Sequence, residues 1–199
     1  MTAYAFELAS TTPMSWAERA AAEPLKLLGD HAHCELQAAV ACSALIARYP
    51  DRPRLVDLAA RVISEEMDHF RRVVKLLREM GGELGESGPN PYVDGLRRSS
   101  SETRRSGLLD RLLFAALIER RSCERFELLA ASGGDARLVR LYEELAPEEV
   151  EHQRLFLDAA RFECPGEEPD RRLAELVEIE ATVMDRLPFS VRMHSGACG

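Results

Sequence analysis

The feature that most constrains this chain is a pair of matching Glu-x-x-His motifs, Glu66 to His69 and Glu149 to His152. This spacing places both side chains of a motif on one face of a helix. Apolar residues recur every three or four positions around both motifs, so the face that carries Glu and His is the one predicted to be buried. Ionisable groups in a core are costly unless a partner compensates them. The chain therefore has to fold around something that neutralises these side chains.

Each motif is preceded by a lone glutamate at a similar distance, Glu35 before the first and Glu119 before the second. A single Glu-x-x-His pattern would be weak evidence, because a Glu-rich chain contains such matches by chance. Both extra glutamates lie on predicted inner faces of helices, like the motifs themselves. The two sets together form an internal repeat, in which a lone Glu is followed about thirty residues later by a Glu-x-x-His motif.

Apolar periodicity and turn residues divide the chain into helices and connections. We expect four long helices at about 24–49, 53–80, 108–131 and 135–162. A short helix is expected to begin at a capping box formed by Ser15 and Glu18, and an additional helix should cover about 169–187. Residues 82–106 are rich in Gly, Pro and Ser and form a long crossover with one short helical turn near 92–98, whereas 188–199 form a tail without periodicity.

Two long helices, a long crossover and two more long helices are typical of ferritin-like bundles. We therefore predict an all-α fold, a ferritin-like four-helix bundle with short N-terminal and extra C-terminal helices, in one domain over residues 1–199. The two halves would be related by pseudo-symmetry, in agreement with the repeated Glu and Glu-x-x-His residues.

Two metal ions would neutralise the buried groups. Carboxylate oxygens suit hard ions such as iron or manganese, and one imidazole per ion completes the set. The bundle class in which each half supplies a Glu and a Glu-x-x-His binds two iron or manganese ions. We predict that Glu35 and His69 bind one ion, that Glu119 and His152 bind the other, and that Glu66 and Glu149 bridge the two. Iron and manganese are both compatible with these ligands.

Three other features lie near the predicted centre. His31, one turn before Glu35, is interpreted as a core histidine or an outer partner of the ligands. Cys42 and Cys123 are interpreted as packing residues near a cavity. Pro147 should bend the fourth long helix, and this bend is either a simple kink or a feature that helps to aim Glu149.

Composition and net charge narrow the classes of protein to which the chain can belong. No signal peptide and no apolar run long enough to cross a bilayer is evident in the 199 residues. The five cysteines are scattered and odd in number, so we expect reduced thiols in a cytoplasmic protein. The net charge of −8 argues mildly against an obligate nucleic-acid binder, although positive charge can be concentrated locally.

Several segments of the chain resemble one enzyme family, the tRNA hydroxylases of 2-methylthio-N6-isopentenyl-adenosine. The resemblance covers most of the chain, and the segment from Ile118 to Phe126 is its most specific part, because generic ferritins lack it. The segments are 12–16, 30–35, 66–70, 92–97, 118–126 and 194–196.

The resemblance implies a non-haem di-iron monooxygenase that hydroxylates the isopentenyl group of this adenosine beside the tRNA anticodon. It would use dioxygen and electrons from a reductase or ferredoxin. The predicted ligands match the family's metal positions: Glu35, Glu66, His69, Glu119, Glu149 and His152. The chain departs from the family pattern at Ala146-Pro147-Glu148, which leaves the ligands intact but puts the cavity shape in doubt.

Arginines around the crossover are the expected phosphate contacts for the anticodon arm, against an otherwise acidic surface. They are Arg97, Arg98, Arg104 and Arg105, with Arg111 nearby. If these arginines do not contact phosphates, the next candidates are Arg120, Arg121 and Arg125. Glu124 and Glu127, which lie among them in the sequence, are expected to be solvated.

Three other functions remain open at this stage. A ferroxidase or iron-storage protein would use the same ligands but assemble into a cage, whereas we expect a monomer or small oligomer. A bundle with a vestigial metal site would serve only as an interaction module. A di-iron oxygenase with another substrate is the third alternative.

Overall fold

The computed structural model describes residues 4–101 and 107–197, which form seven helices and no β-strand. Their bounds are α1 Met14–Ala21, α2 Pro24–Arg48, α3 Pro53–Glu79, α4 Pro91–Ser99, α5 Gly107–Ala131, α6 Ala136–Glu163 and α7 Glu168–Arg186. The all-α prediction is confirmed, and the predicted ends of the long helices lie within one or two residues of the observed ones.

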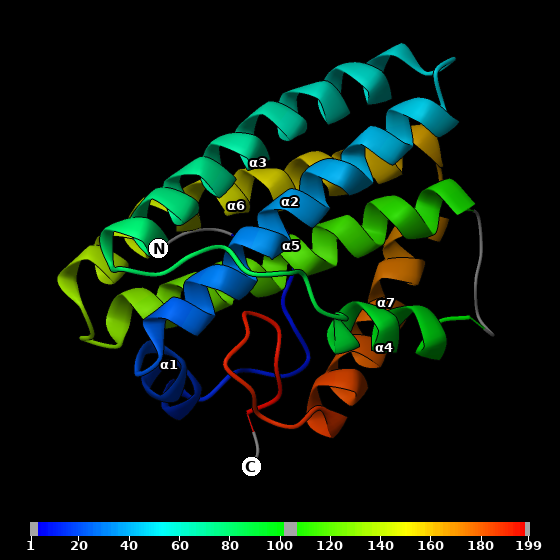
Figure 1. The fold of residues 1–199 in the computed structure, drawn as a ribbon. Helices are drawn as coiled ribbons and strands as arrows, with labels where there is room; N and C mark the ends of the chain where they lie inside the picture. Colours follow the sequence, from blue (N-terminus) through cyan, green and yellow to red (C-terminus); the bar gives the residue numbers. More distant parts are fainter. Residues whose placement is uncertain (1–3, 102–106, 198–199) are drawn as a thin grey trace.

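The four long helices run side by side as a bundle (Figure 1), with α2 packed chiefly on α3 and α5 on α6. The crossover passes over α2 to reach α4, where α4 and α7 pack together at one end of the bundle. The arrangement is the predicted ferritin-like bundle. No helix in the described part of the chain combines the length and the apolar character needed to span a bilayer.

Proline and glycine fix several helix boundaries. Proline occupies the first turn of α2, α3, α4 and α7, where its missing N–H costs nothing. At the end of α3, Gly81 has a φ of +86°, and the N–H of Gly82 donates to the carbonyl of Leu77 over 2.9 Å. This is a glycine C-cap that satisfies a terminal carbonyl and turns the chain into the crossover.

The predicted capping box at Ser15 is wrong. The N-cap of α1 is Pro13, which makes no side-chain cap, and Ser15 already lies inside the helix. Pro13 is held extended, and its carbonyl accepts the N–H of Trp16. Trp16 is completely buried, so the packing of its indole positions this short helix.

The core consists of two apolar clusters. Along α2, for example, Leu45 belongs to one cluster and Leu28 to the other, with Glu35 between them. Along α3, α5 and α6 the predicted ligands likewise lie between residues of the two clusters. The predicted metal ligands therefore occupy a polar layer between two apolar halves of the bundle, where water is excluded from both sides.

A second buried polar system lies on α5, outside the ligand layer. Arg121 is 1% exposed, and its Nε and Nη2 donate to the two carboxylate oxygens of Glu180 on α7 over 2.8 and 2.7 Å. Arg121 also donates to Glu124, which accepts the backbone N–H of Thr12 over 2.9 Å. Paired in this way, the buried charges hold the N-terminal segment and α7 against α5.

This system corrects two expectations. Glu124 is not solvated but largely buried and ion-paired, whereas Glu127 is exposed as expected. Arg120, Arg121 and Arg125 are all buried, so they are not available as a reserve docking surface for nucleic acid. Residues 6–12, helix α7 and residues 194–195 cover this face of α5. Periodicity within α5 alone does not reveal that cover.

The Arg121–Glu180 pair provides a test of this packing. Replacing Glu180 by Gln leaves the Arg121 guanidinium buried without its full counter-charge, and we expect the free energy of unfolding to fall by ~3 kcal/mol. Glu178→Gln is the matched control, because Glu178 is exposed on the same helix. Urea unfolding measures both. Equal unfolding free energies for the two variants would show that the pair does not hold α7 in place.

Candidate metal centre

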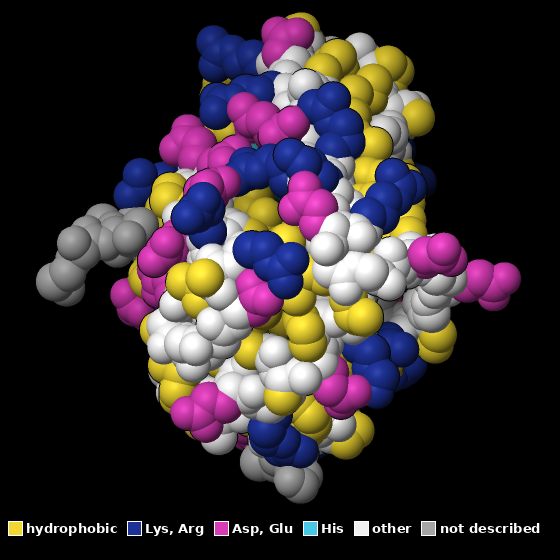
Figure 2. Space-filling model, turned by 60° about the vertical axis from the view of Figure 1, so that its left-hand side comes forward, with side chains coloured by type: hydrophobic (Ala, Val, Ile, Leu, Met, Phe, Trp, Pro, Cys, Tyr) yellow, Lys and Arg dark blue, Asp and Glu magenta, His cyan; other side chains and the backbone are white. Residues whose placement is uncertain are grey.

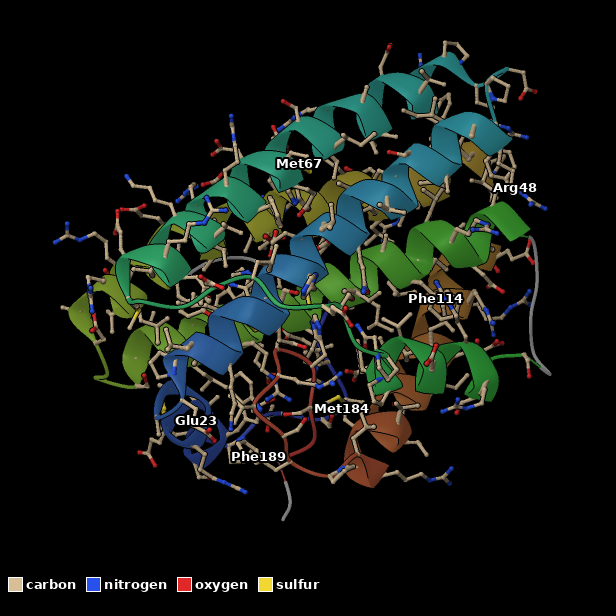
Figure 3. All side chains as sticks on the ribbon, in the orientation of Figure 1. Glu23, Arg48, Met67, Phe114, Met184 and Phe189 are labelled. Atoms are coloured by element: carbon tan, nitrogen blue, oxygen red, sulfur yellow. The ribbon has the colours of Figure 1, made fainter. Side chains whose placement is uncertain are left out.

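The structure brings all six predicted ligands into one buried layer. Each side chain is at most 6% exposed: Glu35 on α2, Glu66 and His69 on α3, Glu119 on α5, and Glu149 and His152 on α6. Potential ligand atoms of four of them, Glu66, His69, Glu149 and His152, lie within 4.8 Å of one another. Figure 3 draws the four long helices that carry these residues together with the described side chains.

The two motif glutamates lie between the two imidazoles. Glu149 has one carboxylate oxygen 3.1 Å from His69 Nδ1 and the other 3.3 Å from His152 Nδ1. Glu66 has one oxygen 2.9 Å from His152 Nδ1 and the other 3.9 Å from His69 Nδ1. Glu35 approaches His69 Nδ1 at 3.3 Å. Both motif glutamates therefore lie between the two imidazoles, and their assignment as bridging ligands stays a prediction.

Several atoms that face the centre have no hydrogen-bond partner among the described residues. They are Glu35 Oε2, Glu66 Oε1, His69 Nδ1 and Glu149 Oε1, all buried. Their separations are short, but their directions do not satisfy hydrogen-bond geometry, which is unusual for buried polar atoms. Carboxylate oxygens and imidazole nitrogens in this arrangement are ligands for iron or manganese. The residues present therefore fit a two-metal carboxylate centre.

Burial and mutual repulsion dominate the titration of the acidic groups. Burial raises the pKa of Glu66 and of Glu119 well above the usual range, and the charge of Glu149 adds to both shifts. Burial alone would also raise the pKa of Glu149, but its contacts with the imidazoles of His152 and His69 hold it well below the usual value. Burial opposes protonation of His69, yet its contacts with Glu149 and Glu35 raise its pKa to about 12. In the absence of metal, protons on the imidazoles supply the missing positive charge.

An outer layer of carboxylates orients both imidazoles. Nε2 of His69 lies 3.1 Å from Glu148 on α6, and Nε2 of His152 lies 3.0 Å from Glu65 on α3. The pairing is crosswise, since each carboxylate contacts the histidine of the other half. Such partners fix the ring orientation of a metal-binding histidine, here with Nδ1 turned inward.

Glu65 and Glu148 were not predicted as partners of the two metal-binding histidines. The signal was present, because both motifs begin with two consecutive glutamates, Glu65-Glu66 and Glu148-Glu149. On a helix adjacent residues point in different directions, so only the crossing of α3 and α6 brings these groups to the opposite histidine.

His31 has the outer position that was one of its two interpretations. It is completely buried, and its Nε2 lies 2.6 Å from Glu35 Oε1. Tyr142 lies 3.4 Å from its Nδ1. Helix α6 continues through Pro147, which has no N–H for the carbonyl one turn earlier. The contribution of Pro147 to the aim of Glu149 stays a prediction.

A cavity of about 440 Å³ leads from the surface to Glu119 between α2, α4 and α5. Its walls are largely apolar and include Val93, Leu96, Phe114, Ile118 and Phe156. Phe114 lies on the side of α5 that faces α4 (Figure 3). Cys42 lines the cavity as expected, whereas Cys123 is buried beside Gln153 instead. Among the described cysteines, residues 34, 42, 123 and 164, none forms a disulfide.

The predicted arginines divide into three groups. Arg97 on α4 and Arg111 on α5 line the cavity and are exposed. Arg98 is exposed on α4 but does not line the cavity. Arg104 and Arg105 lie outside the described residues. Elsewhere, positive and negative side chains are interspersed, as the face in Figure 2 shows, so a broad single-sign patch is not evident on that face.

Each of the four long helices buries a glutamate in one layer, and on two of these helices the glutamate belongs to a Glu-x-x-His motif. This arrangement defines a ferritin-like bundle of the class that holds two metal ions with carboxylate and histidine ligands. Within this class the chain belongs to the tRNA-(MS2IO6A)-hydroxylase (MiaE) family, whose model matches residues 2–195.

Two curated relatives carry the name tRNA 2-(methylsulfanyl)-N(6)-isopentenyladenosine(37) hydroxylase. The protein of Pseudomonas putida KT2440 is 35% identical over 95% of this chain and 92% of its own length. That of Salmonella typhimurium LT2 is 29% identical over 72% of this chain and 52% of its own length. A solved structure, a Synechococcus protein with aldehyde deformylating oxygenase activity, superposes with a TM-score of 0.87 at 35% identity, over 96% of both chains.

The pKa shifts predict how metal should stabilise the protein at different pH. The metal-free fold holds extra protons on Glu66, Glu119, His69 and His152, whose pKa values are raised. Its stability therefore falls as pH rises, from about 4.5 for the glutamates and from about 6.5 for the histidines. Metal ligation instead requires these groups to be deprotonated. We expect the gain in unfolding temperature on adding Fe²⁺ under anaerobic conditions to be larger at pH 8 than at pH 6.

The lowered pKa values of Glu65 and Glu148 do not reverse this trend, because those groups titrate below the pH range compared. A gain from Fe²⁺ that is the same at both pH values, or larger at pH 6, would contradict the proposed ligand set.

Proposed function

We propose that this protein hydroxylates the isopentenyl group of 2-methylthio-N6-isopentenyl-adenosine beside the anticodon of tRNA. The observation that carries the proposal is the apolar cavity that ends at Glu119 in the ligand layer, in a chain of this hydroxylase family. The names of the two curated relatives support the same substrate. Family membership favours this reaction over iron oxidation or storage, and we place it in the cytoplasm with its tRNA substrate.

We propose two iron ions as the cofactor. Glu35 and His69 would hold one ion, Glu119 and His152 the other, with Glu66 and Glu149 between them. With dioxygen and electrons from an external reductase or ferredoxin, the bound iron would supply the oxidation of a C–H bond, which side chains cannot achieve. Glu65 and Glu148 keep the two imidazoles oriented, and the apolar clusters on either side exclude water from the layer.

The cavity suits a prenylated base. Its volume of about 440 Å³ lies within the range of roughly 300–1,000 Å³ found for small-molecule sites. The apolar walls would hold the five-carbon tail against Glu119, while the base stays nearer the opening. Such an entry requires the adenosine to turn out of the stacked anticodon loop, as bases recognised in single-stranded RNA commonly do.

The opening of the cavity carries positive charge for the RNA backbone. Arg97 and Arg111 line it, and Arg98 is exposed on the same short helix as Arg97. We propose that these arginines contact phosphates of the anticodon arm. Arg104 and Arg105 remain part of the same proposal on sequence grounds alone.

The reaction can be tested by reconstituting the protein with Fe²⁺ and supplying prenylated tRNA, dioxygen and an electron donor. We expect mass analysis of the nucleosides to show one added oxygen on the modified adenosine. His152→Ala should lose most bound iron and reduce turnover at least 100-fold, because a ligand to one ion is lost. His33→Ala is the control, since His33 lies outside the ligand layer and bonds only the crossover carbonyl of Gly85 among the described residues.

Wild-type protein that leaves this nucleoside unchanged but converts a long-chain aldehyde would overturn the proposed substrate. Full turnover by the His152→Ala variant would overturn the proposed ligands.

The arginine contacts can be tested through the salt dependence of binding. Replacing Arg97 and Arg98 together by Ala should weaken binding of a prenylated anticodon stem-loop and reduce the slope of log K against log salt by roughly 1 to 2. Iron content should not change. The control is the double replacement of Arg71 and Arg78 by Ala, because both are exposed on α3, which lies on the opposite side of the bundle from α4 (Figure 1). If both double variants show the wild-type slope, the docking surface lies elsewhere.

A further inference from the structure

After α7 the chain turns back as a closed loop, residues 188–197, which lies between α1 and α7 beneath α5 (Figure 1). The N–H of Gly196 donates to the carbonyl of Pro188 over 3.1 Å, and a Cβ on Gly196 would lie only 1.6 Å from the carbonyl oxygen of Leu187. Glycine is therefore required where the two ends of the loop meet.

The loop is anchored to the bundle by buried polar contacts. The N–H of Met193 donates to Asp30 on α2 over 2.8 Å, and Arg125 on α5 donates to the carbonyl of Ser195 over 2.8 Å. The indole of Trp16 donates to the hydroxyl of Ser195 over 3.0 Å. These contacts come from three helices, so the residue between Met193 and Ser195 is held in a fixed position.

That residue is His194, which is 6% exposed and forms part of the cavity wall. Its ring stacks on Tyr92 with centroids 4.9 Å apart and an interplanar angle of 12°. Its Nε2 lies 3.2 Å from the hydroxyl of Ser122, three residues after Glu119 on α5. The ring is thus fixed in orientation within the cavity wall.

The second ring nitrogen of His194 lacks a strong partner. Among the described residues its Nδ1 has only the thiol of Cys34, at 3.9 Å, and a thiol is a weak hydrogen-bonding group. Cys34 lines the cavity and Ser122 does not, so Nδ1 is the nitrogen on the cavity side. A buried nitrogen without a good partner costs free energy unless a ligand satisfies it.

His194 is neutral at physiological pH, because burial and the nearby charges of Arg125 and Arg121 lower its pKa to about 3. In a neutral imidazole one nitrogen donates and the other accepts. The hydroxyl of Ser122 can take either role, so Nδ1 is free to meet a donor or an acceptor.

We propose that Nδ1 of His194 hydrogen-bonds the adenine ring of the substrate and so fixes the base while its five-carbon tail points to the ligand layer. This rests on the proposed function. Adenine carries its exocyclic N–H and ring nitrogens next to the attachment point of the tail, and in a largely apolar cavity these groups need a polar partner. Sites that hydrogen-bond a substrate in this way discriminate strongly against molecules that lack the group. His194 is a positioning residue, and the C-terminal loop holds it in place.

Three substitutions separate this role from a structural one. His194→Phe keeps a ring to stack on Tyr92 but removes both nitrogens. His194→Asn places an amide near the position of Nδ1, on the cavity side. His194→Gln places it near Nε2, on the side of Ser122. If the cavity contact matters, Asn should restore function and Gln should not, whereas a structural contact to Ser122 predicts the reverse.

Binding to the metal-free protein gives a measurement that does not depend on turnover. We expect His194→Phe to weaken binding of a prenylated anticodon stem-loop about tenfold and to leave binding of the same stem-loop with an abasic site unchanged. In the iron-loaded enzyme, His194→Phe and His194→Gln should lower kcat/KM by about 10- to 100-fold through misplacement of the substrate, with normal iron content, and His194→Asn should restore most of it.

The outcomes distinguish the two proposals. Wild-type protein that binds prenylated and abasic stem-loops equally would overturn the proposed function and the role of His194 with it. If the wild type clearly prefers the prenylated stem-loop and the Phe variant keeps that preference, the role of His194 alone is overturned. If the Phe variant fails to fold, the comparison of Asn with Gln decides, because equal loss in both, or recovery only in Gln, shows that His194 is structural.

Discussion

Everything in this molecule depends on the cost of placing four carboxylates and two imidazoles in a dry layer between two apolar clusters. The layer is stable only if positive charge enters it, as protons on His69 and His152 or as metal ions. Its geometry requires four helices that are long enough to carry apolar residues on both sides of their ligands. The pseudo-symmetry follows from the same requirement, because each half supplies one set of ligands and an outer glutamate to orient the histidine of the other half.

Much of this was predictable from the sequence, because the information is local. The spacing of Glu66 and His69 within an apolar repeat predicts the helix, its buried face and the chemistry of that face at once. What could not be predicted depends on residues far apart in sequence. Glu124 resembles a solvated residue among arginines until Thr12 and Arg121 are seen to enclose it. The two consecutive glutamates at the start of each motif are a local signal, but that signal does not assign Glu65 or Glu148 to a histidine on another helix. The tail has no periodicity that would predict His194 in the wall of a cavity.

The covering of the ligand layer is asymmetric although the ligands are not. On the side of α2 and α5, helix α4, the crossover and the C-terminal loop build the walls of a cavity that reaches Glu119. Between α3 and α6, the outer carboxylates form ion pairs with arginines, Glu65 with Arg61 and Glu148 with Arg72. One face of the bundle is therefore shaped to admit a substrate, while the other is built to hold the histidines in position.

This division explains how one bundle can serve different reactions. The Synechococcus protein with aldehyde deformylating oxygenase activity shares the fold along almost its whole length, so the bundle alone does not specify what is oxidised. The choice has to be made by elements that touch the substrate but not the metal ions. In the reaction proposed for this chain, the groups in that position are Arg97 on α4, Phe114 on α5 and the loop that presents His194. All three lie outside the repeated Glu and Glu-x-x-His positions, so they can change without disturbing the charge balance on which the fold depends.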